Sequence, residues 1–233
     1  MNQRTAFGSD YSSIPVSQAA DAARAAFVSR VYGLMFATMV AASAASAFAF
    51  EPAVAPFTTF LARHWFLAML GYYGLAFGVH AVSRVPVVGS VLMLGFGVFT
   101  GLWIAPMVHY YAQANPAAIT SALLGTAGIF GSMSLIGAFT KRDLSGLGGF
   151  LLPGVIVAVV LSLLNVFFLG SSLLSTALSA VIVLIFAGYV AHNTQNVLQR
   201  YPLNAHVSAA MQLYLDVFII FIHLLSLFGG NRR

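Results

Sequence analysis

Asp216 is the residue of this chain whose type and position point most directly to chemistry. It is one of only five acidic residues among 233, and it lies inside the long apolar stretch of residues 207–228. A carboxyl group at that depth in a bilayer costs at least about 2.5 kcal/mol on insertion scales, so it is by default a candidate functional group. It could act as a titratable gate or bind a cation in a polar cavity. The alternative is a protonated carboxyl that only holds helices together.

Asn193 is the candidate partner of Asp216. If residues 172–193 and 207–228 form consecutive antiparallel helices, both side chains lie roughly 10–14 Å from the short loop that joins them, at 1.5 Å per residue. The two could therefore meet, although a helix-joining amide is the simpler role for Asn193. The candidates for supporting roles are His192, Gln195, Tyr214 and His223.

No catalytic or cofactor-binding motif is present in the sequence. A single intramembrane carboxylate cannot form the aspartate pair of an intramembrane protease, and no Gly-x-Ser-x-Gly, P-loop or dinucleotide fingerprint occurs. Cysteine is absent, and the six histidines lack zinc-binding spacing. We therefore expect no enzyme activity and no cofactor, and Asp216 is the one candidate metal ligand.

The composition is that of a protein dissolved in lipid. Hydrophobic residues make up 60% of the chain and charged residues 6%, against roughly 25% charged in soluble domains. The ten Lys and Arg residues that give a net charge of +5 are scattered, so no basic run could follow a phosphate backbone. We expect membrane lipid, and no nucleic acid, as a partner.

Seven segments are long and apolar enough to span a bilayer, which needs about 20 residues. They are residues 28–50, 65–83, 87–111, 117–139, 149–170, 172–193 and 207–228. The predicted fold class is an all-α integral membrane protein, with a polar cytoplasmic tail at residues 1–25 and a seven-helix domain at residues 26–230. The alternative is six spans plus a re-entrant last segment.

The distribution of basic residues predicts the orientation of these spans. With seven spans, seven of the ten Lys and Arg residues lie on the side of the N-terminus and three on the other side. Since basic loops stay in the cytoplasm, the N-terminus is expected there, in a bacterial inner membrane. Small residues at close-packing spacing, such as Gly97 and Gly101, predict tight bundling within a monomer, with a weak homo-oligomer as the alternative.

Several stretches from the third span to the C-terminus resemble the Bax inhibitor-1 family, including its bacterial YccA and YetJ-type members. One is a Gly-x-x-aliphatic-Gly-Pro element in which Ala105 replaces the second Gly. Another is an Ala-x-x-x-Thr-Ala-x-x-Phe element at residues 122–130. The matching stretches are residues 101–107, 122–130, 140–148, 193–195 and 213–229.

The resemblance implies a seven-helix bundle with the last helix central. It also implies a pH-sensitive calcium leak linked to two aspartates, one in each of the last two spans. One of them corresponds to Asp216, but the other position is Asn193. Two close carboxylates share a proton, whereas an amide and a carboxyl do not. Calcium usually takes 6–8 oxygen ligands, so this pair makes a poorer calcium site.

Two functions therefore remain open at the level of the sequence. The first is a cation leak channel, with calcium as the transported ion and a pathway or gate formed by Asp216 and Asn193. pH gating would then depend on other groups, such as the imidazole of His192 or His223, which titrates near ~6.5. The second is a non-conducting regulator of an FtsH-like membrane protease or of another membrane protein.

Overall fold

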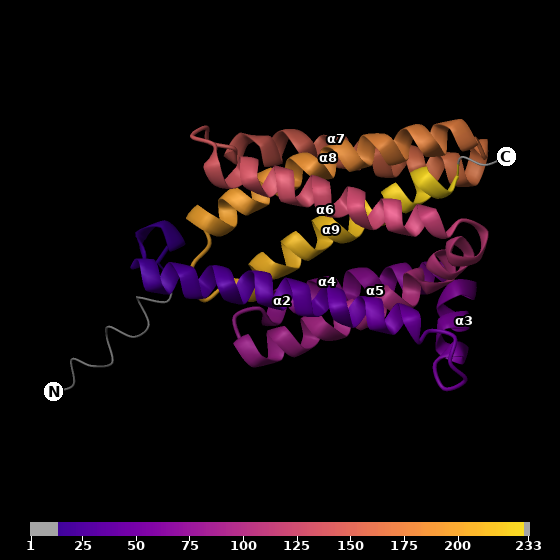
Figure 1. Cartoon of the computed structure of the whole chain (residues 1–233), viewed down its shortest axis with the longest axis horizontal. Helices are drawn as coiled ribbons and strands as arrows, with labels where there is room; N and C mark the ends of the chain where they lie inside the picture. Colours follow the sequence, from indigo (N-terminus) through magenta and orange to yellow (C-terminus); the bar gives the residue numbers. More distant parts are fainter. Residues whose placement is uncertain (1–13, 231–233) are drawn as a thin grey trace. The chain divides into compact units, whose positions relative to one another are not determined.

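The computed structural model describes residues 14–230, and this part of the chain is helical apart from short loops and one isolated β-bridge. Figure 1 follows the helices along the sequence. The elements are η1 (Val16–Gln18), α2 (Asp21–Ala47), α3 (Ala55–Arg63), α4 (Trp65–Val82), α5 (Pro86–Ala114), α6 (Pro116–Phe139), α7 (Ser145–Leu164), the π-helical turn η2 (Asn165–Leu169), α8 (Ser172–Gln199) and α9 (His206–Gly229).

The prediction of seven membrane-spanning segments is confirmed. Seven helices of the described chain are long and apolar enough to cross a membrane: α2, α4, α5, α6, α7 with η2, α8 and α9. The last of them is one continuous helix of 24 residues, about 36 Å long at 1.5 Å per residue, which is enough for a full crossing. It is also the most buried, with half of its apolar stretch inside the protein against 39% for α5 and less for the others.

The structure differs from the prediction at several helix ends. The first span begins at Asp21 rather than at residue 28, inside the segment predicted as a polar tail, and residues 1–13 of that tail lie outside the described residues. The sixth span continues to Gln199. The predicted first loop, between Glu51 and Arg63, contains the helix α3, which begins with a proline in its first turn, where the missing N–H costs nothing.

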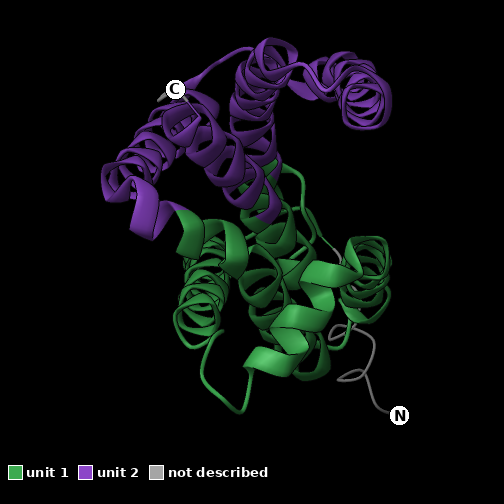
Figure 2. Cartoon of the chain, turned by 90° about the vertical axis from the view of Figure 1, so that its right-hand side faces the viewer, with its two compact units in different colours: residues 1–110, 197–214 green, residues 111–196, 215–233 purple. Residues whose placement is uncertain are grey.

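The helices fall into two compact units, coloured separately in Figure 2. Unit 1 comprises residues 1–110 and 197–214, and unit 2 comprises residues 111–196 and 215–233. The predicted 26–230 domain is thus divided between two units of packing. Each unit is described separately below.

Unit 1 is built on a close crossing of α2 and α5. A Cβ atom added to Gly97 would lie 2.7 Å from the carbonyl oxygen of Thr38, and one added to Gly101 would overlap the backbone of Ala42. Glycine is therefore required where these two backbones meet, as is usual in membrane bundles. The small-residue spacing predicted from the sequence serves packing within the chain here.

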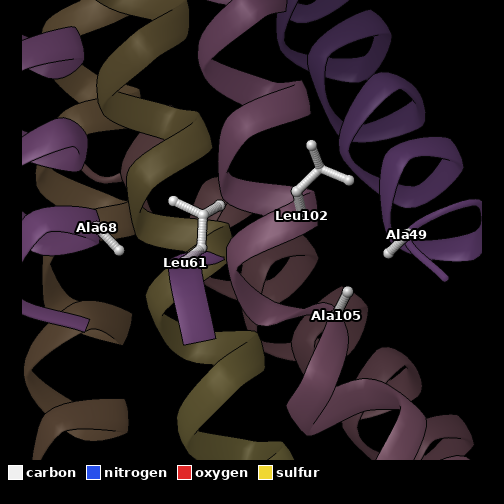
Figure 3. Close-up of a cluster of buried hydrophobic side chains, with 5 residues drawn as sticks. All are labelled: Ala49, Leu61, Ala68, Leu102 and Ala105. Carbon is white, nitrogen blue, oxygen red and sulfur yellow. The ribbon is translucent and has the colours of Figure 1, made fainter. Parts of the chain in front are cut away.

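Within unit 1, the helix α3 is held against its neighbours by a small apolar cluster. Figure 3 shows its buried members: Ala49, Leu61, Ala68, Leu102 and Ala105. Thr58, in the middle of α3, donates a hydrogen bond from Oγ1 to the carbonyl oxygen of Ala49 at 2.9 Å. Since this hydroxyl is buried, the bond fixes the helix beneath the end of α2.

The start of the described chain is also tied into unit 1. Pro15 and Pro202 form an isolated antiparallel bridge. The backbone N–H of Val16 donates to Tyr201 at 2.9 Å, and that of Leu203 donates to Ile14 at 3.3 Å. The segment before the first span and the loop before the last span therefore lie side by side.

Unit 2 contains α6, α7, most of α8 and the second half of α9. Glycines again mark the close contacts: Gly137 of α6 meets the backbone of Ala191 on α8, and Gly154 of α7 meets Ile185 on α8. The turn from η2 to α8 is closed by Asn165, which accepts from the N–H of Ser171 and donates to its carbonyl, both at 3.0 Å. Gly170 in this turn has φ 59°, a conformation that glycine adopts without strain.

Candidate functional site

Asn193 and Asp216 form a direct hydrogen bond inside unit 2. The amide Nδ2 of Asn193 on α8 donates to Oδ2 of Asp216 on α9 at 2.8 Å. Both side chains are buried, with 7% and 3% of their surfaces exposed. The pairing predicted from the position of the two residues along their helices is present in the structure.

This pair satisfies polar groups that would otherwise be costly in a membrane. A buried donor or acceptor left without a partner loses about 1–3 kcal/mol. Among residues 14–230, no buried side-chain nitrogen or oxygen lacks a hydrogen-bond partner. The amide supplies a donor to the carboxyl without adding a second negative charge.

Gln195 has a different role from the one suggested by its position. It lies two positions after Asn193 on α8 and binds the backbone of the loop between α6 and α7. Its Oε1 accepts from the N–H of Leu144, and its Nε2 donates to the carbonyl of Arg142, both at 2.8 Å. The side chain thus forms hydrogen bonds with two backbone groups two residues apart, and these bonds fix the loop on α8.

His192 holds the same loop from the preceding position. Its Nδ1 lies 2.8 Å from the carbonyl oxygen of Leu144. A carbonyl only accepts, so Nδ1 carries the proton, and in the neutral ring Nε2 then accepts from Nδ2 of Asn196 at 2.9 Å. The residues on either side of Asn193 therefore anchor a loop that exposes Lys141 and Arg142.

Tyr214 belongs to another environment, in unit 1. Its hydroxyl is hydrogen-bonded to that of Thr100 on α5. Its ring meets Phe96 edge-on, with centroids 5.8 Å apart. The sequence placed Tyr214 near Asp216 because they are two residues apart, but residues at that spacing point to different sides of a helix.

His223 faces a polar cavity of unit 2. Its Nδ1 lies 3.3 Å from Oγ of Ser179 on α8. Two turns of α9 separate it from Asp216, and the seven-residue spacing puts both on one face, as predicted. The cavity holds about 200 Å³ and is lined by Ser162, Asn165, Val166, Ser175, Leu178, Ser179, His223 and Ser226.

The pair is a weak candidate for a tightly bound metal. Within the described residues, no group of three or more His, Cys, Asp or Glu side chains comes together that could hold a metal ion. One carboxylate and one amide supply few of the 6–8 oxygen ligands that calcium usually takes.

Sequence reasoning missed the functions of Gln195 and of the serines around His223. These residues were visible as pairs three or four positions apart, Ser175 and Ser179 on one segment and His223 and Ser226 on another. Such pairs share a helix face. Their common cavity depends on how three helices meet, and the sequence alone does not determine this.

Comparison with known proteins finds similarity to one family along most of the chain. A family model described as "Inhibitor of apoptosis-promoting Bax1" matches residues 24–233. An uncharacterized protein of Deinococcus radiodurans is 38% identical over 155 residues, 63% of this chain and 64% of that protein.

Two relatives come from Escherichia coli strain K12. The "Modulator of FtsH protease YccA" is 33% identical over 168 residues, 72% of this chain and 75% of its own length. The "Inner membrane protein YbhL" is 35% identical over 159 residues, 62% of this chain and 64% of its own length. The alignments thus span about two thirds to three quarters of these relatives. With a family match that covers both units of packing, this chain belongs to the Bax inhibitor-1 family of membrane proteins.

Proposed function

We propose that this protein is a non-conducting regulator of a membrane protease of the FtsH type. The observation that carries the proposal is the similarity to YccA, which is named as a modulator of FtsH protease and is 33% identical over 72% of this chain. The protein would act by binding in the membrane and would catalyse no reaction of its own. It would need no cofactor and would reside in a bacterial inner membrane.

The geometry around Asp216 supports a structural rather than a conducting role for the pair. The carboxyl is hydrogen-bonded by Asn193, and α8 is fixed to the α6–α7 loop by Gln195, two positions further along the same helix. A hydrogen-bonded pair of this kind holds α8 and α9 together. A fixed arrangement of helices suits a protein that binds a partner through a surface of constant shape. A conduction pathway instead needs a site that is easily entered and left.

The test is purification of the tagged protein from its native membranes under mild detergent. We expect an FtsH-like protease to co-purify, and degradation of a membrane substrate of that protease to change when the regulator is deleted. Asp216→Asn is the matched variant, because it keeps a group of the same shape and should leave co-purification intact. If neither association nor a change in degradation is found, the regulator proposal is wrong.

The second candidate is a cation leak, and the buried carboxyl at Asp216 favours it. An ionisable group in a membrane span commonly marks an ion pathway. In this case Asp216 would line the pathway, Asn193 would orient it, and calcium would be the transported ion. The protein would then be a monomer or a weak oligomer with one pathway per chain.

Calcium flux into liposomes distinguishes the two candidates. The regulator predicts no flux above that of empty liposomes at any pH, whereas the leak predicts flux that Asp216→Asn alters. Asn193→Asp adds the second carboxylate, and two carboxylates at hydrogen-bonding distance titrate as a pair. A leak that depends on pH only in Asn193→Asp would indicate that Asn193 removes the pH gate.

A further inference from the structure

Six of the eight residues that line the cavity around His223 are polar, and they come from three separate helices of unit 2; Val166 and Leu178 complete the lining. Helix α7 with its π-helical turn contributes Ser162 and Asn165, α8 contributes Ser175 and Ser179, and α9 contributes His223 and Ser226. On each helix the two residues are three or four positions apart, so they share a face. Three helices therefore turn polar faces to one space, inside segments that are otherwise strongly apolar.

The cavity lies near one end of these helices. Figure 1 shows the turn between η2 and α8 at the same end of unit 2 as the last turns of α9. Ser175 is three residues into α8 and Ser179 is seven, or about 5 and 10 Å from the end of the helix at 1.5 Å per residue. That depth lies within reach of water at a membrane interface.

Two of the polar residues that line the cavity are bonded to the backbone, and His223 is bonded through one of its two ring nitrogens. Ser162 donates to the carbonyl of Ala158, and Asn165 is occupied by Ser171. His223 meets Ser179 through Nδ1, which leaves Nε2 to the cavity. A volume of about 200 Å³ has room for several water molecules, which need polar partners of this kind.

We propose that this cavity is a water-filled vestibule, open at the end of the η2–α8 turn, through which water reaches the imidazole of His223. Imidazole is the side chain suited to proton exchange near neutral pH. Of the residues that line the cavity, His223 is the only titratable one; α7 and α8 contribute only hydroxyls, one amide and aliphatic groups. The nearest acidic group on its own face of α9 is Asp216, two turns away.

The vestibule stops short of Asp216. Seven residues separate His223 from Asp216, about 10.5 Å along the helix, and the fully buried Ile220 lies between them. Water in the cavity would therefore hydrate His223 but not the Asn193–Asp216 pair. The proposal goes beyond both proposed functions and does not depend on either, because it concerns solvent access at one end of unit 2.

Exchange of the imidazole C2 hydrogen for deuterium tests the proposal in the unmodified protein. The exposed His64 and the buried His206 serve as internal references. If water fills the vestibule, His223 exchanges within about tenfold of His64 and its rate follows one titration curve, since water and proton access are unhindered. Exchange more than about a hundredfold slower than His64 would overturn the proposal, because it would mean that lipid or protein excludes water.

A cysteine scan gives an independent test, because the chain contains no cysteine. Ser175→Cys and Ser226→Cys lie in the cavity, and Thr176→Cys is a matched control at the same depth on the exposed face of α8. In sealed vesicles, a charged, membrane-impermeant thiol reagent should modify the two cavity variants at least about tenfold faster than the control, and from one side only. Equal rates would overturn the proposal.

A permeant maleimide, applied to the same variants, checks that each cysteine is present and reactive. If the maleimide modifies Ser175→Cys and Ser226→Cys but the charged reagent does not, the cavity opens to lipid and the vestibule proposal fails. Calcium flux and protease association play no part in these readouts. Failure here would therefore leave both proposed functions untouched.

Discussion

The hydrogen bond from Asn193 to Asp216 determines what the centre of unit 2 can do. The amide gives the buried carboxyl a hydrogen-bond donor and brings no second negative charge. The neighbouring residues extend the same principle, since Gln195 and His192 use their polar atoms on the backbone of the α6–α7 loop. In this region of α8, the polar side chains of His192, Asn193 and Gln195 therefore all have hydrogen-bond partners within unit 2.

Asp216→Ala should destabilise the protein more than Asp216→Asn. Alanine leaves the buried Nδ2 of Asn193 without an acceptor, at a cost of about 1–3 kcal/mol. Asparagine offers a carbonyl oxygen in the same place, and we expect it to change stability by less than half as much. Thermal unfolding in detergent, followed by loss of helical signal, measures both variants.

Asn193→Leu provides the reciprocal control for this prediction. It removes the donor and leaves the Asp216 carboxyl buried without its partner, so it too should lower the unfolding temperature. In the double variant Asn193→Leu with Asp216→Leu, both polar groups are gone, and the loss should be smaller than the sum of the single losses. Strictly additive losses would show that the hydrogen bond contributes little.

At the scale of the elements, close backbone contacts explain why particular helices pair. The crossing of α2 and α5 in unit 1 requires glycine at positions 97 and 101, while Gly95 on the same helix has open space around its Cα. The α6–α7 loop is fixed to α8 by the side chains of His192 and Gln195. Each helix is thus positioned by a few specific contacts in addition to its apolar surface.

Gly101→Ala should destabilise unit 1, whereas Gly95→Ala should not. An added methyl group at position 101 overlaps the backbone of Ala42, and overpacking of this kind costs about 1–3 kcal/mol. At position 95 the methyl group meets nothing within 4 Å, so alanine should be neutral or stabilise the helix by about 0.5–1 kcal/mol. Unfolding temperatures in detergent compare the two; equal changes would contradict the close crossing.

Gln195→Ala should release the α6–α7 loop without unfolding α8. It removes both hydrogen bonds to Arg142 and Leu144, while His192 keeps one contact. We expect faster amide exchange at residues 142–145 and more rapid proteolysis after the exposed Lys141 and Arg142. Gln199→Ala, at an exposed position of the same helix, is the control and should leave both rates unchanged.

Much of this arrangement follows from the sequence, and the exceptions have identifiable physical reasons. The depth of Asp216 and the register of two consecutive helices placed Asn193 beside it. The helix α3 escaped notice because nine residues are too short to span a membrane and look like a loop between breakers. Tyr214 was placed with Asp216 by proximity along the chain, but its hydroxyl finds Thr100, more than a hundred residues earlier.

At the scale of the whole molecule, the bridge between Pro15 and Pro202 bears on how many times the chain crosses the membrane. Two segments that pair directly lie on one side, so an even number of crossings must separate them. Six span-length helices do: α2, α4, α5, α6, α7 with η2, and α8. This parity agrees with the six crossings that precede α9, whether α9 then crosses or re-enters.

Single cysteines on the cysteine-free background test this topology. Lys141→Cys follows four crossings, Glu51→Cys follows one and Gly230→Cys follows seven, and all three positions are exposed. An impermeant thiol reagent should modify Lys141→Cys from the cytoplasmic side, and the other two from the opposite side. Modification of Gly230→Cys from the same side as Lys141→Cys would show instead that the last segment re-enters.

The same bridge has a consequence for how the protein is made. Its first strand-like segment leaves the ribosome early, but residues 201–203 are synthesised only after six helices. Unit 1 is therefore an interrupted unit: residues 111–196, which belong to unit 2, are translated between its two parts. A nascent chain that stops before residue 197 lacks the piece that completes unit 1, so this unit can reach its final packing only after residues 197–214 have been synthesised.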